Sequence, residues 1–392
     1  MEIPGESHHL PELDGVRGIA ILAVLLAHGA DFLHVLPIQH PAHTLSTMPY
    51  PLLLQGWGGV DLFFTLSGFL ITGILLRSRS RTTYFSSFYM RRILRIFPVY
   101  YLFLIVSFGA SFLTSWQALD IQHHWKWWLP YFFYIENWPV FWASWAGMLS
   151  LWGVYWSLAV EEQFYFIWPA LVRIFSPRFM LVLCVCGFFL GAPERLSMMH
   201  LHGVQFGIME WPFSRLDGLF LGAAIAFYRH LYGRPVPLRL GGLALGAGAA
   251  IYIWLLSAHR IEFFGSGLHI WGFGVTAFAL MSAGLIITTQ HRVALVNQVL
   301  TLSPLRIAGR LSYGMYVYHV IVYRLILSFL RAKIFPRFGE TPSLFRGVLV
   351  ISCSILIVTA IAELSFCFFE TPFLRLKRFF PSPAPPVSQV ST

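Results

Sequence analysis

The chain has 392 residues, of which 57% are hydrophobic and only 11% are charged. Soluble domains carry about 25% charged residues, so this composition excludes an ordinary soluble protein and indicates a polytopic membrane protein whose helices face lipid. The formal net charge of +10 would suit a nucleic-acid-binding protein only if the basic residues formed one patch.

Ten apolar stretches follow one another along the chain, and a helix needs about 20 apolar residues to cross a bilayer. The sequence therefore predicts an all-α transmembrane bundle of about ten spans. The fifth span looks short, and its start is expected before residue 178. Around the membrane domain (14–378), we expect a cytoplasmic N-terminal segment (1–13) and a disordered cytoplasmic tail (379–392) that is rich in Pro and Ser. The predicted spans are 16–36, 58–76, 96–115, 150–172, 178–192, 212–230, 239–257, 268–289, 311–331 and 345–368.

The stretch 116–149 is rich in Trp, contains Pro130 and Pro139, and carries Glu136. Trp favours the membrane–water interface, and Pro interrupts a helix. We interpret this stretch as an interfacial or re-entrant segment outside the bilayer core. The alternative, an eleventh span within it, stays open.

The basic residues predict the orientation, because cytoplasmic loops of membrane proteins are enriched in Lys and Arg. With a cytoplasmic N-terminus, 17 of the 27 basic residues fall in inner segments and about eight in outer ones. This asymmetry favours two cytoplasmic termini in a multi-pass protein of the cytoplasmic membrane. It also excludes nucleic acid as the partner, since the charge is divided among loops, as anchoring to anionic lipid requires.

Three ionisable residues share one face of the first predicted helix, within "LDGVRGIAILAVLLAHGAD". His28 follows Arg17 by eleven positions, which is about 20° beyond three turns and roughly 16 Å along the axis. Asp14 lies one turn before Arg17. Ionisable residues within a span are costly and are functional candidates by default. The alternative is a buried histidine that is hydrogen-bonded to a backbone carbonyl.

The second span carries Asp61 and Ser67 among several glycines, in "GWGGVDLFFTLSGFLITG". Small residues allow helices to pack closely, and they also allow a backbone to approach a ligand. Both interpretations remain open from the sequence.

Two arginines, Arg92 and Arg95, are three positions apart in "FYMRRILRIFPVYY" at the end of the predicted inner loop. This spacing makes them neighbours on one helical face. They are either topology anchors or a phosphate clamp, because guanidinium groups pair well with phosphate.

Further polar groups lie within the later spans. Glu161 and Glu162 stand near the middle of "WSLAVEEQFYFIWP", and adjacent carboxylates cannot both avoid lipid unless one faces a polar interior or is protonated. One bundle therefore gathers acid–base and cationic groups at membrane depth, which indicates a reaction route through it.

The four cysteines lie in apolar runs without zinc-ligand spacing, so no metal site is predicted. The remaining polar candidates are Arg215 and Asp217 in the sixth span, Tyr313 and His319 in the ninth, and Glu370 after the tenth.

Seven stretches together resemble the acyltransferase 3 family of integral-membrane acyltransferases, in order and over nearly the whole chain. Any one of them is weakly specific, but seven in register are highly specific. They are "LDGVRGIAILAVLLAH", "GGVDLFFTLSGFLIT", "RRILRIFPVYY", "WSLAVEEQFYFIWP", "RLDGLFLG", "LSYGMYVYH" and "ETPFLRLKR".

The resemblance implies an enzyme that moves an acyl group, usually acetyl, from coenzyme A to a hydroxyl group. Typical acceptors are surface carbohydrates or small molecules. The family's arginine–histidine motif, whose histidine is held to be catalytic, falls on Arg17 and His28. Its arginine pair falls on Arg92 and Arg95, and its mid-span glutamate falls on Glu161. Many relatives also carry an extracytoplasmic SGNH-type domain. The chain ends after the tenth predicted span, so acceptance is expected on the membrane domain or with a separate partner.

Residues and resemblance together predict a mechanism. Arg92, Arg95 and Arg17 bind the phosphates of acetyl-CoA, and His28 acts as general base toward the acceptor hydroxyl. Glu161 is expected to orient the imidazole. A transient acyl-histidine is an alternative. Asp14 is expected to hold Arg17, and supporting roles are expected for Asp61, Ser67, Arg215, Tyr313 and His319.

A transporter or flippase of a lipid-linked or small-molecule substrate is the alternative from another functional class, since it would also place charges near the midplane. The sequence shows no inverted repeat and no matching pair of Gly/Pro-broken helices, which favours the enzyme. A saccharide is the expected acceptor, with polyketide, lipid headgroup and peptidoglycan-like hydroxyls also open.

Overall fold

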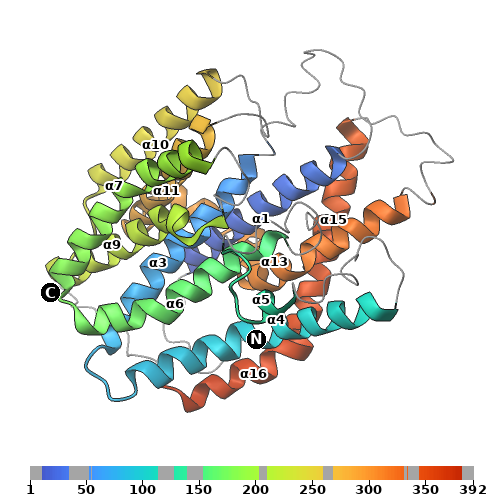
Figure 1. Cartoon of the computed structure of the whole chain (residues 1–392), viewed down its shortest axis with the longest axis horizontal. Coiled ribbons are helices and arrows are strands. Elements are labelled where there is room, and N and C mark those ends of the chain that lie inside the picture. Colours follow the sequence, from blue (N-terminus) through green and yellow to red (C-terminus); the bar gives the residue numbers. More distant parts are fainter. Residues whose placement is uncertain are drawn as a thin grey trace.

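The computed structural model describes residues 11–34, 53, 55–113, 128–138, 153–202, 210–258, 268–330, 333 and 344–381. Within these ranges every regular element is a helix (Figure 1). Ten long helices overlap the ten predicted spans. They are α1 (Pro11–His34), α3 (Gly58–Ser78), α4 (Tyr84–Leu113), α6 (Trp156–Ile174), α7 (Pro177–His202), α9 (Leu216–Tyr232), α10 (Leu238–Ala258), α11 (Leu268–Gln290), α13 (Ser303–Phe329) and α15 (Leu344–Ser365).

Seven of the described stretches are long and apolar enough to cross a membrane, and they involve α1, α3, α4, α7, α10, α11 and α15. The helices α6, α9 and α13 do not meet that standard. The 17 residues of α9 are few for a span, and α6 carries two adjacent glutamates. Length and composition therefore support a multi-pass membrane protein, whereas ten spans and cytoplasmic termini stay predictions.

Three helix boundaries differ from the expected ones by eight residues or more. The helix α4 begins at Tyr84 rather than near residue 96, so the arginine pair lies on the helix itself. The helix α7 does not end before Pro193 but continues to His202. Proline is tolerated inside membrane helices because neighbouring groups satisfy the freed backbone carbonyl. The helix α13 begins eight residues before its predicted start, at Ser303.

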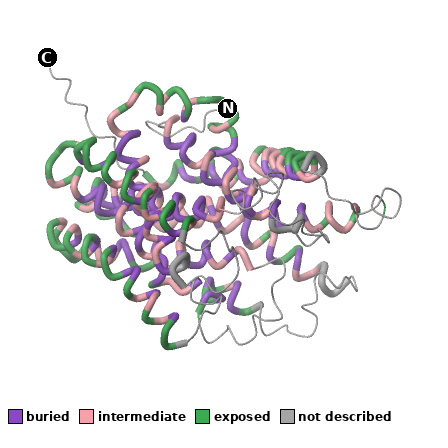
Figure 2. Tube along the Cα trace, turned by 90° about the horizontal axis from the view of Figure 1, so that it is seen from above, coloured by how far each residue is buried: buried purple, intermediate pink, exposed green. Residues whose placement is uncertain are grey.

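The bundle has two groups of helices, which the packing of α1 on α3 joins (Figure 1). The helices α7, α9, α10 and α11 pack together beside α3, and α13 and α15 pack beside α1. Buried residues run through the middle, and exposed ones lie on the outer helices (Figure 2). Those outer faces are apolar, as in Leu243 of α10 and Leu356 of α15, which suits contact with lipid.

Glycines explain how closely these helices approach one another. A Cβ atom at Gly59 of α3 would lie 2.4 Å from the Ala20 carbonyl oxygen of α1, and one at Gly68 would lie 2.0 Å from the Leu219 carbonyl oxygen of α9. The glycines of the second predicted span therefore serve helix packing, which is the simpler of the two interpretations that the sequence left open.

Residues 128–138 form the short helix α5 (Trp128–Phe132) and a following turn. This segment packs on the bundle, because Tyr100 of α4 donates a hydrogen bond to the Tyr131 carbonyl (2.9 Å) and Gln163 of α6 donates one to the Tyr134 carbonyl (2.6 Å). Tyr134 has a positive φ of 54°, which a non-glycine residue rarely adopts. These eleven residues contain no membrane-crossing helix. The rest of the predicted interfacial stretch, residues 1–10 and residues 382–392 of the predicted tail lie outside the described residues.

The remaining short elements connect the long helices. They are η2 (Gln55–Trp57), η6 (Gly153–Tyr155), η7 (Pro212–Arg215), α12 (Ala294–Leu300), the π-helical turn η9 (Phe366–Glu370), α16 (Thr371–Arg375) and η10 (Leu376–Phe379).

Candidate active site

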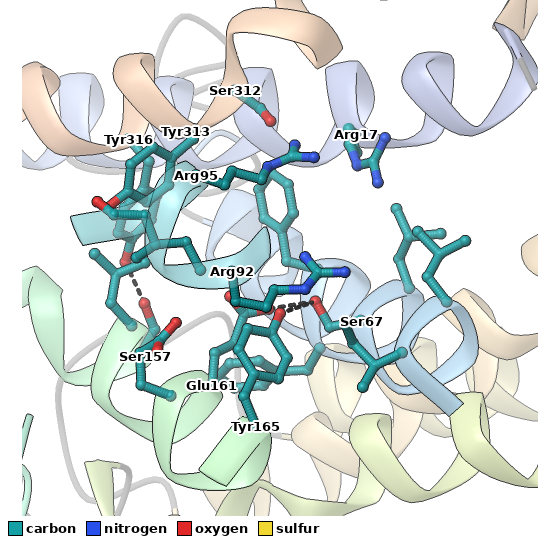
Figure 3. A pocket seen from close by; sticks show the side chains of 18 of the residues that line it. Arg17, Ser67, Arg92, Arg95, Ser157, Glu161, Tyr165, Ser312, Tyr313 and Tyr316 are labelled. Carbon is teal, nitrogen blue, oxygen red and sulfur yellow. Dashed lines mark hydrogen bonds between the residues drawn. The ribbon is translucent and has the colours of Figure 1, made fainter. Parts of the chain in front are cut away.

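A pocket of about 110 Å³ lies among α1, α3, α4, α6 and α13 (Figure 3). Apolar side chains such as Phe64 and Leu70 form part of its wall, and 11 of its 19 lining residues are polar or charged. Its polar lining consists of Arg17, Ser67, Arg92, Arg95, Ser157, Glu161, Glu162, Tyr165, Ser312, Tyr313 and Tyr316.

Three arginines contribute the positive charge of the pocket. Asp14 pairs with Arg17 at 2.9 Å, one turn away on α1, which is the contact that its expected role requires. Arg92 lies over the rings of Phe88 and Tyr165, at 5.9 and 5.4 Å from their centres. Arg95 follows one turn later on α4, so both guanidinium groups reach the same pocket.

The carboxyl group of Glu161 lies on the opposite wall, where Ser67 of α3 donates a short hydrogen bond to it. Tyr165 in turn donates to the Ser67 hydroxyl at 3.1 Å. In the described part of the chain Glu161 hydrogen-bonds to Ser67 and Tyr165, whereas the His28 ring contacts His319 and the Val24 backbone. The expected orientation of the His28 imidazole by Glu161 therefore stays a prediction. Helical periodicity indicated that Glu161 faces the interior, but it could not say which helix lies opposite.

The two histidines, His28 of α1 and His319 of α13, meet away from the pocket lining. His28 Nδ1 lies 3.1 Å from His319 Nε2, and the ring centres are 5.0 Å apart. His319 Nδ1 lies 2.6 Å from the carbonyl oxygen of Tyr316. The sequence marked both residues as candidates but did not pair them, since 291 positions separate them.

Tyr316 connects the pocket to the histidine pair. Its side chain lines the pocket, and its ring centre lies 5.4 Å from that of His319. Its hydroxyl donates to the Val154 carbonyl at 2.7 Å and lies 2.6 Å from the Ser157 hydroxyl (Figure 3). One helical turn of α13 therefore separates the end of the pocket from the imidazoles.

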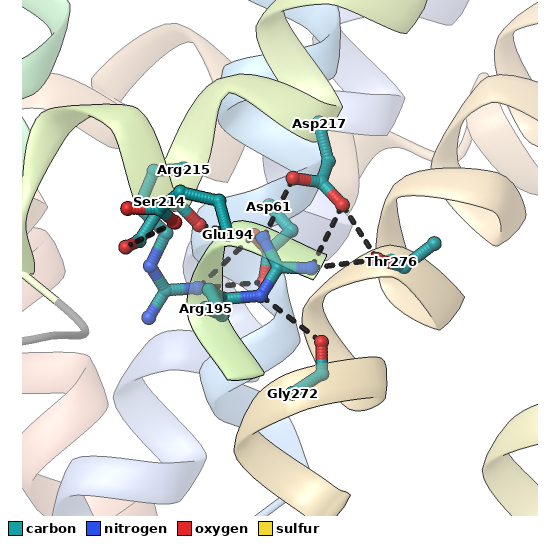
Figure 4. A network of polar contacts seen from close by, with 8 residues as sticks. All are labelled: Asp61, Glu194, Arg195, Ser214, Arg215, Asp217, Gly272 and Thr276. Atoms are coloured by element: carbon teal, nitrogen blue, oxygen red, sulfur yellow. Dashed lines mark hydrogen bonds and ion pairs between the residues drawn. The ribbon is translucent and has the colours of Figure 1, made fainter. Parts of the chain in front are cut away.

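A second polar cluster holds helices together rather than lining the pocket (Figure 4). Arg215 pairs with Asp61 of α3 at 3.2 Å and lies over the Trp156 ring at 4.8 Å. Arg195 pairs with both carboxylate oxygens of Asp217, at 2.7 and 2.9 Å. The buried role of Arg195 was not predicted from the sequence, because the fifth predicted span ends at residue 192, before Pro193.

Two buried carboxyl groups lie outside the candidate spans, on Glu136 and Glu210. The Asn137 side chain donates to the Glu210 carbonyl oxygen at 3.1 Å, which brings the two segments together. Burial raises the pKa of Glu136 well above its ordinary value and that of Glu210 to about 8. Both carboxyl groups therefore favour the protonated form at neutral pH.

No group of three or more His, Cys, Asp or Glu side chains is placed to hold a metal ion in the described ranges. The cysteines there are free thiols. The candidate active site therefore consists of the arginine-lined pocket with its carboxyl groups and of the neighbouring His28–His319 pair.

Comparison with known proteins agrees with this combination of groups. The model of the acyltransferase domain matches residues 10–363. The chain belongs to the acyltransferase 3 family. It is 28% identical to peptidoglycan O-acetyltransferase OatA of Listeria monocytogenes, over 94% of this chain and 56% of that protein. It is 26% identical to O-acetyltransferase OatA of Staphylococcus aureus, over 95% and 58%.

A third relative is the putative peptidoglycan O-acetyltransferase YrhL of Bacillus subtilis, 27% identical over 93% of this chain and 55% of that protein. The chain therefore spans just over half the length of these relatives. No solved structure matches the chain.

The residues of the family motifs lie at two neighbouring sites, the pocket and the histidine pair. Arg17, Arg92, Arg95 and Glu161 line the pocket, whereas His28 lies in the histidine pair. Other predicted supporting residues also line the pocket, namely Ser67 and Tyr313. Asp61 and Arg215 form a separate ion pair beside them.

Proposed function

We propose that the chain is an integral-membrane O-acyltransferase that moves an acyl group, in the simplest case acetyl, from acyl-CoA to a hydroxyl group of a saccharide. The observation that carries this proposal is a pocket with three arginines that ends one helical turn from the His28–His319 pair. The names of the relatives support acetyl as the acyl group and a peptidoglycan-type saccharide as the acceptor. The chain acts in the cytoplasmic membrane, with both termini inside.

The arginines bind the donor through its phosphates. Guanidinium groups form strong, often bidentate hydrogen bonds with phosphate, and Arg17, Arg92 and Arg95 face one pocket. The nucleotide of acyl-CoA therefore stays at the arginines, and its thin pantetheine arm enters the bundle.

The pantetheine arm then leads toward the imidazoles. Hydroxyl groups of Ser67, Tyr165 and Ser157 line its route and are suitable partners for its amide groups. The helix α1 is continuous from Pro11 to His34, so His28 lies about 16 Å beyond Arg17 along the axis. This separation is comparable to the reach of the arm.

The reaction needs one base that later acts as an acid. His28 accepts the proton of the acceptor hydroxyl, whose oxygen attacks the thioester carbonyl carbon. The carbon–sulfur bond breaks, and the resulting imidazolium returns the proton to the sulfur of CoA. The products are an ester and free CoA thiol. If the imidazole attacks the thioester itself, an acyl-histidine precedes the ester, and mass spectrometry of acid-quenched protein detects it on the His28 peptide.

The test uses the full chain in nanodiscs with acetyl-CoA and soluble peptidoglycan fragments. Release of CoA thiol and the mass of the acylated fragment are measured together. His28→Ala should lower turnover by about 10²–10⁴-fold, the usual cost of losing a general base. The matched control is His291→Ala, because the His291 side chain hydrogen-bonds to the Val236 carbonyl and does not line the pocket, and this variant should remain fully active.

Wild-type turnover in folded His28→Ala protein would remove His28 from the chemistry. If the wild-type protein carries fragments across a vesicle membrane without consuming acetyl-CoA, the protein is a transporter instead.

A further inference from the structure

We infer that His319 is a positioning residue that sets the tautomer of His28, so that His28 Nε2 carries the lone pair that receives the acceptor proton. This inference rests on the proposed function, and it adds a second histidine with a defined role. It follows from the two hydrogen bonds that His319 makes within the bundle.

The first step concerns His319 Nδ1, which lies 2.6 Å from the Tyr316 carbonyl oxygen. A carbonyl oxygen can only accept a hydrogen bond, so Nδ1 must carry the hydrogen. With the hydrogen on the other nitrogen alone, two lone pairs would face each other at this distance.

The second step concerns the charge of His319. Its side chain is 0% exposed, and among the described residues its ring hydrogen-bonds only to the backbone of Tyr316 and Met315 and to the His28 ring, none of which is an anion. A buried cation without an anionic partner is strongly unfavourable. The ring is therefore neutral, and because Nδ1 holds its one hydrogen, Nε2 holds a lone pair.

The third step passes this constraint to His28. His319 Nε2 lies 3.1 Å from His28 Nδ1, and a hydrogen bond at this distance needs one hydrogen between the two nitrogens. His319 Nε2 has none, so His28 Nδ1–H donates it. In neutral His28 the lone pair must then lie on Nε2, which is the nitrogen that faces away from His319.

The same hydrogen bond acts during the reaction. When His28 Nε2 takes up a proton, the ring becomes a cation and its Nδ1–H becomes a stronger donor to His319. His319 thus stabilises the imidazolium without accepting its proton, as the acid of a catalytic triad does.

The test compares two side chains of similar size at position 319. His319→Gln keeps an acceptor oxygen near the position of Nε2, whereas His319→Leu offers none. The leucine variant should lower kcat by about 10- to 100-fold, the effect of losing a buried hydrogen bond to a reacting group, with KM for acetyl-CoA unchanged. The glutamine variant should recover most of this loss. His319→Ala gives the same comparison if the leucine variant does not fold.

The control for loosened helix packing is Tyr323→Phe. Tyr323 of α13 donates a buried hydrogen bond to the Leu25 carbonyl of α1 at 2.9 Å, and its ring lies edge-on to the His319 ring, with 6.1 Å between their centres. Phenylalanine keeps this ring, so the variant removes only the hydrogen bond between the same two helices. It should keep wild-type kcat. In the His28→Ala background, His319→Leu should cause no further loss, because coupled residues are not additive.

The inference is overturned if the leucine and glutamine variants are equally slow, or if the leucine variant turns over like wild type. Both results leave the proposed function intact as long as His28→Ala remains inactive. An active His28→Ala variant would instead overturn the proposed role of His28 itself.

Discussion

The Arg92 guanidinium lies over the ring of Tyr165, with 5.4 Å between its carbon and the ring centre. The helix α6 thus holds in place an arginine that α4 contributes. The preceding residue, Arg91, points elsewhere, because its Nη1 donates to the carbonyl oxygens of Lys377 and Phe380 at 3.2 and 3.0 Å. Two adjacent arginines of one helix therefore serve different purposes.

This difference gives a matched test of the donor site. Arg92→Ala and Arg95→Ala should each weaken acetyl-CoA binding by roughly 10- to 100-fold, since a hydrogen bond to a charged group contributes about 1.5–3 kcal/mol. Arg91→Ala removes the same charge from the same helix and should bind acetyl-CoA like wild type. Lysine at position 92 or 95 should restore binding only in part, because it lacks the planar fork.

Calorimetry with the protein in detergent measures these affinities, and the wild-type affinity should fall as salt is added. If Arg92→Ala and Arg95→Ala, like Arg91→Ala, bind acetyl-CoA with wild-type affinity, the pocket arginines are topology anchors only.

The buried and exposed ion pairs should differ in their effect on stability. The Arg195 and Asp217 side chains are both 0% exposed, so Asp217→Ala leaves a buried charge without its anion and should cost about 3–5 kcal/mol. The Arg310 and Glu363 side chains are 42% and 41% exposed, and Glu363→Ala should cost about 0–1 kcal/mol. Thermal unfolding in detergent measures both variants. Similar shifts in Tm would contradict the buried pairing.

Glycine substitutions test the close approach of α9 to α3. A Cβ atom at Gly222 would lie 1.9 Å from the Thr65 carbonyl oxygen, whereas one at Gly246 of α10 would meet no atom within 4 Å. Gly222→Ala should destabilise the bundle by about 1–3 kcal/mol through overpacking. Gly246→Ala should be neutral or slightly stabilising, because Ala favours a helix over Gly. The same unfolding measurement applies, and a stable Gly222→Ala variant would rule out this packing.

Orientation is tested by labelling introduced cysteines in intact cells, in a background without the four native ones. Cysteines at Ser80 and Ser176, which follow α3 and α6, should resist a membrane-impermeant thiol reagent, because the charge asymmetry places these turns inside. A cysteine at Ser257, near the end of α10, should react. All three positions are exposed in the structure. Labelling at Ser176 would mean that the helices between Ser80 and Ser176 cross the membrane an odd number of times.

The sequence by itself determined the features that depend on nearby residues. Apolar length predicted where the ten long helices lie, because lipid requires every backbone group to be paired within a helix. Helical spacing placed Asp14 one turn from Arg17 and set Arg92 beside Arg95, and the structure confirms both placements. The ordered motifs identified the family, which the match to residues 10–363 confirms.

The tertiary structure alone decided which polar groups face one another across helices. Periodicity indicates the face of a helix that is buried, but not the helix that packs on it. The partner of Glu161 is Ser67, 94 positions away, and the partner of His28 is His319, 291 positions away. Pro193 also predicted a helix end, so the buried ion pair of Arg195 was not expected. The helix α7 continues past Pro193, because packing against neighbouring helices compensates for the hydrogen bond that proline cannot make.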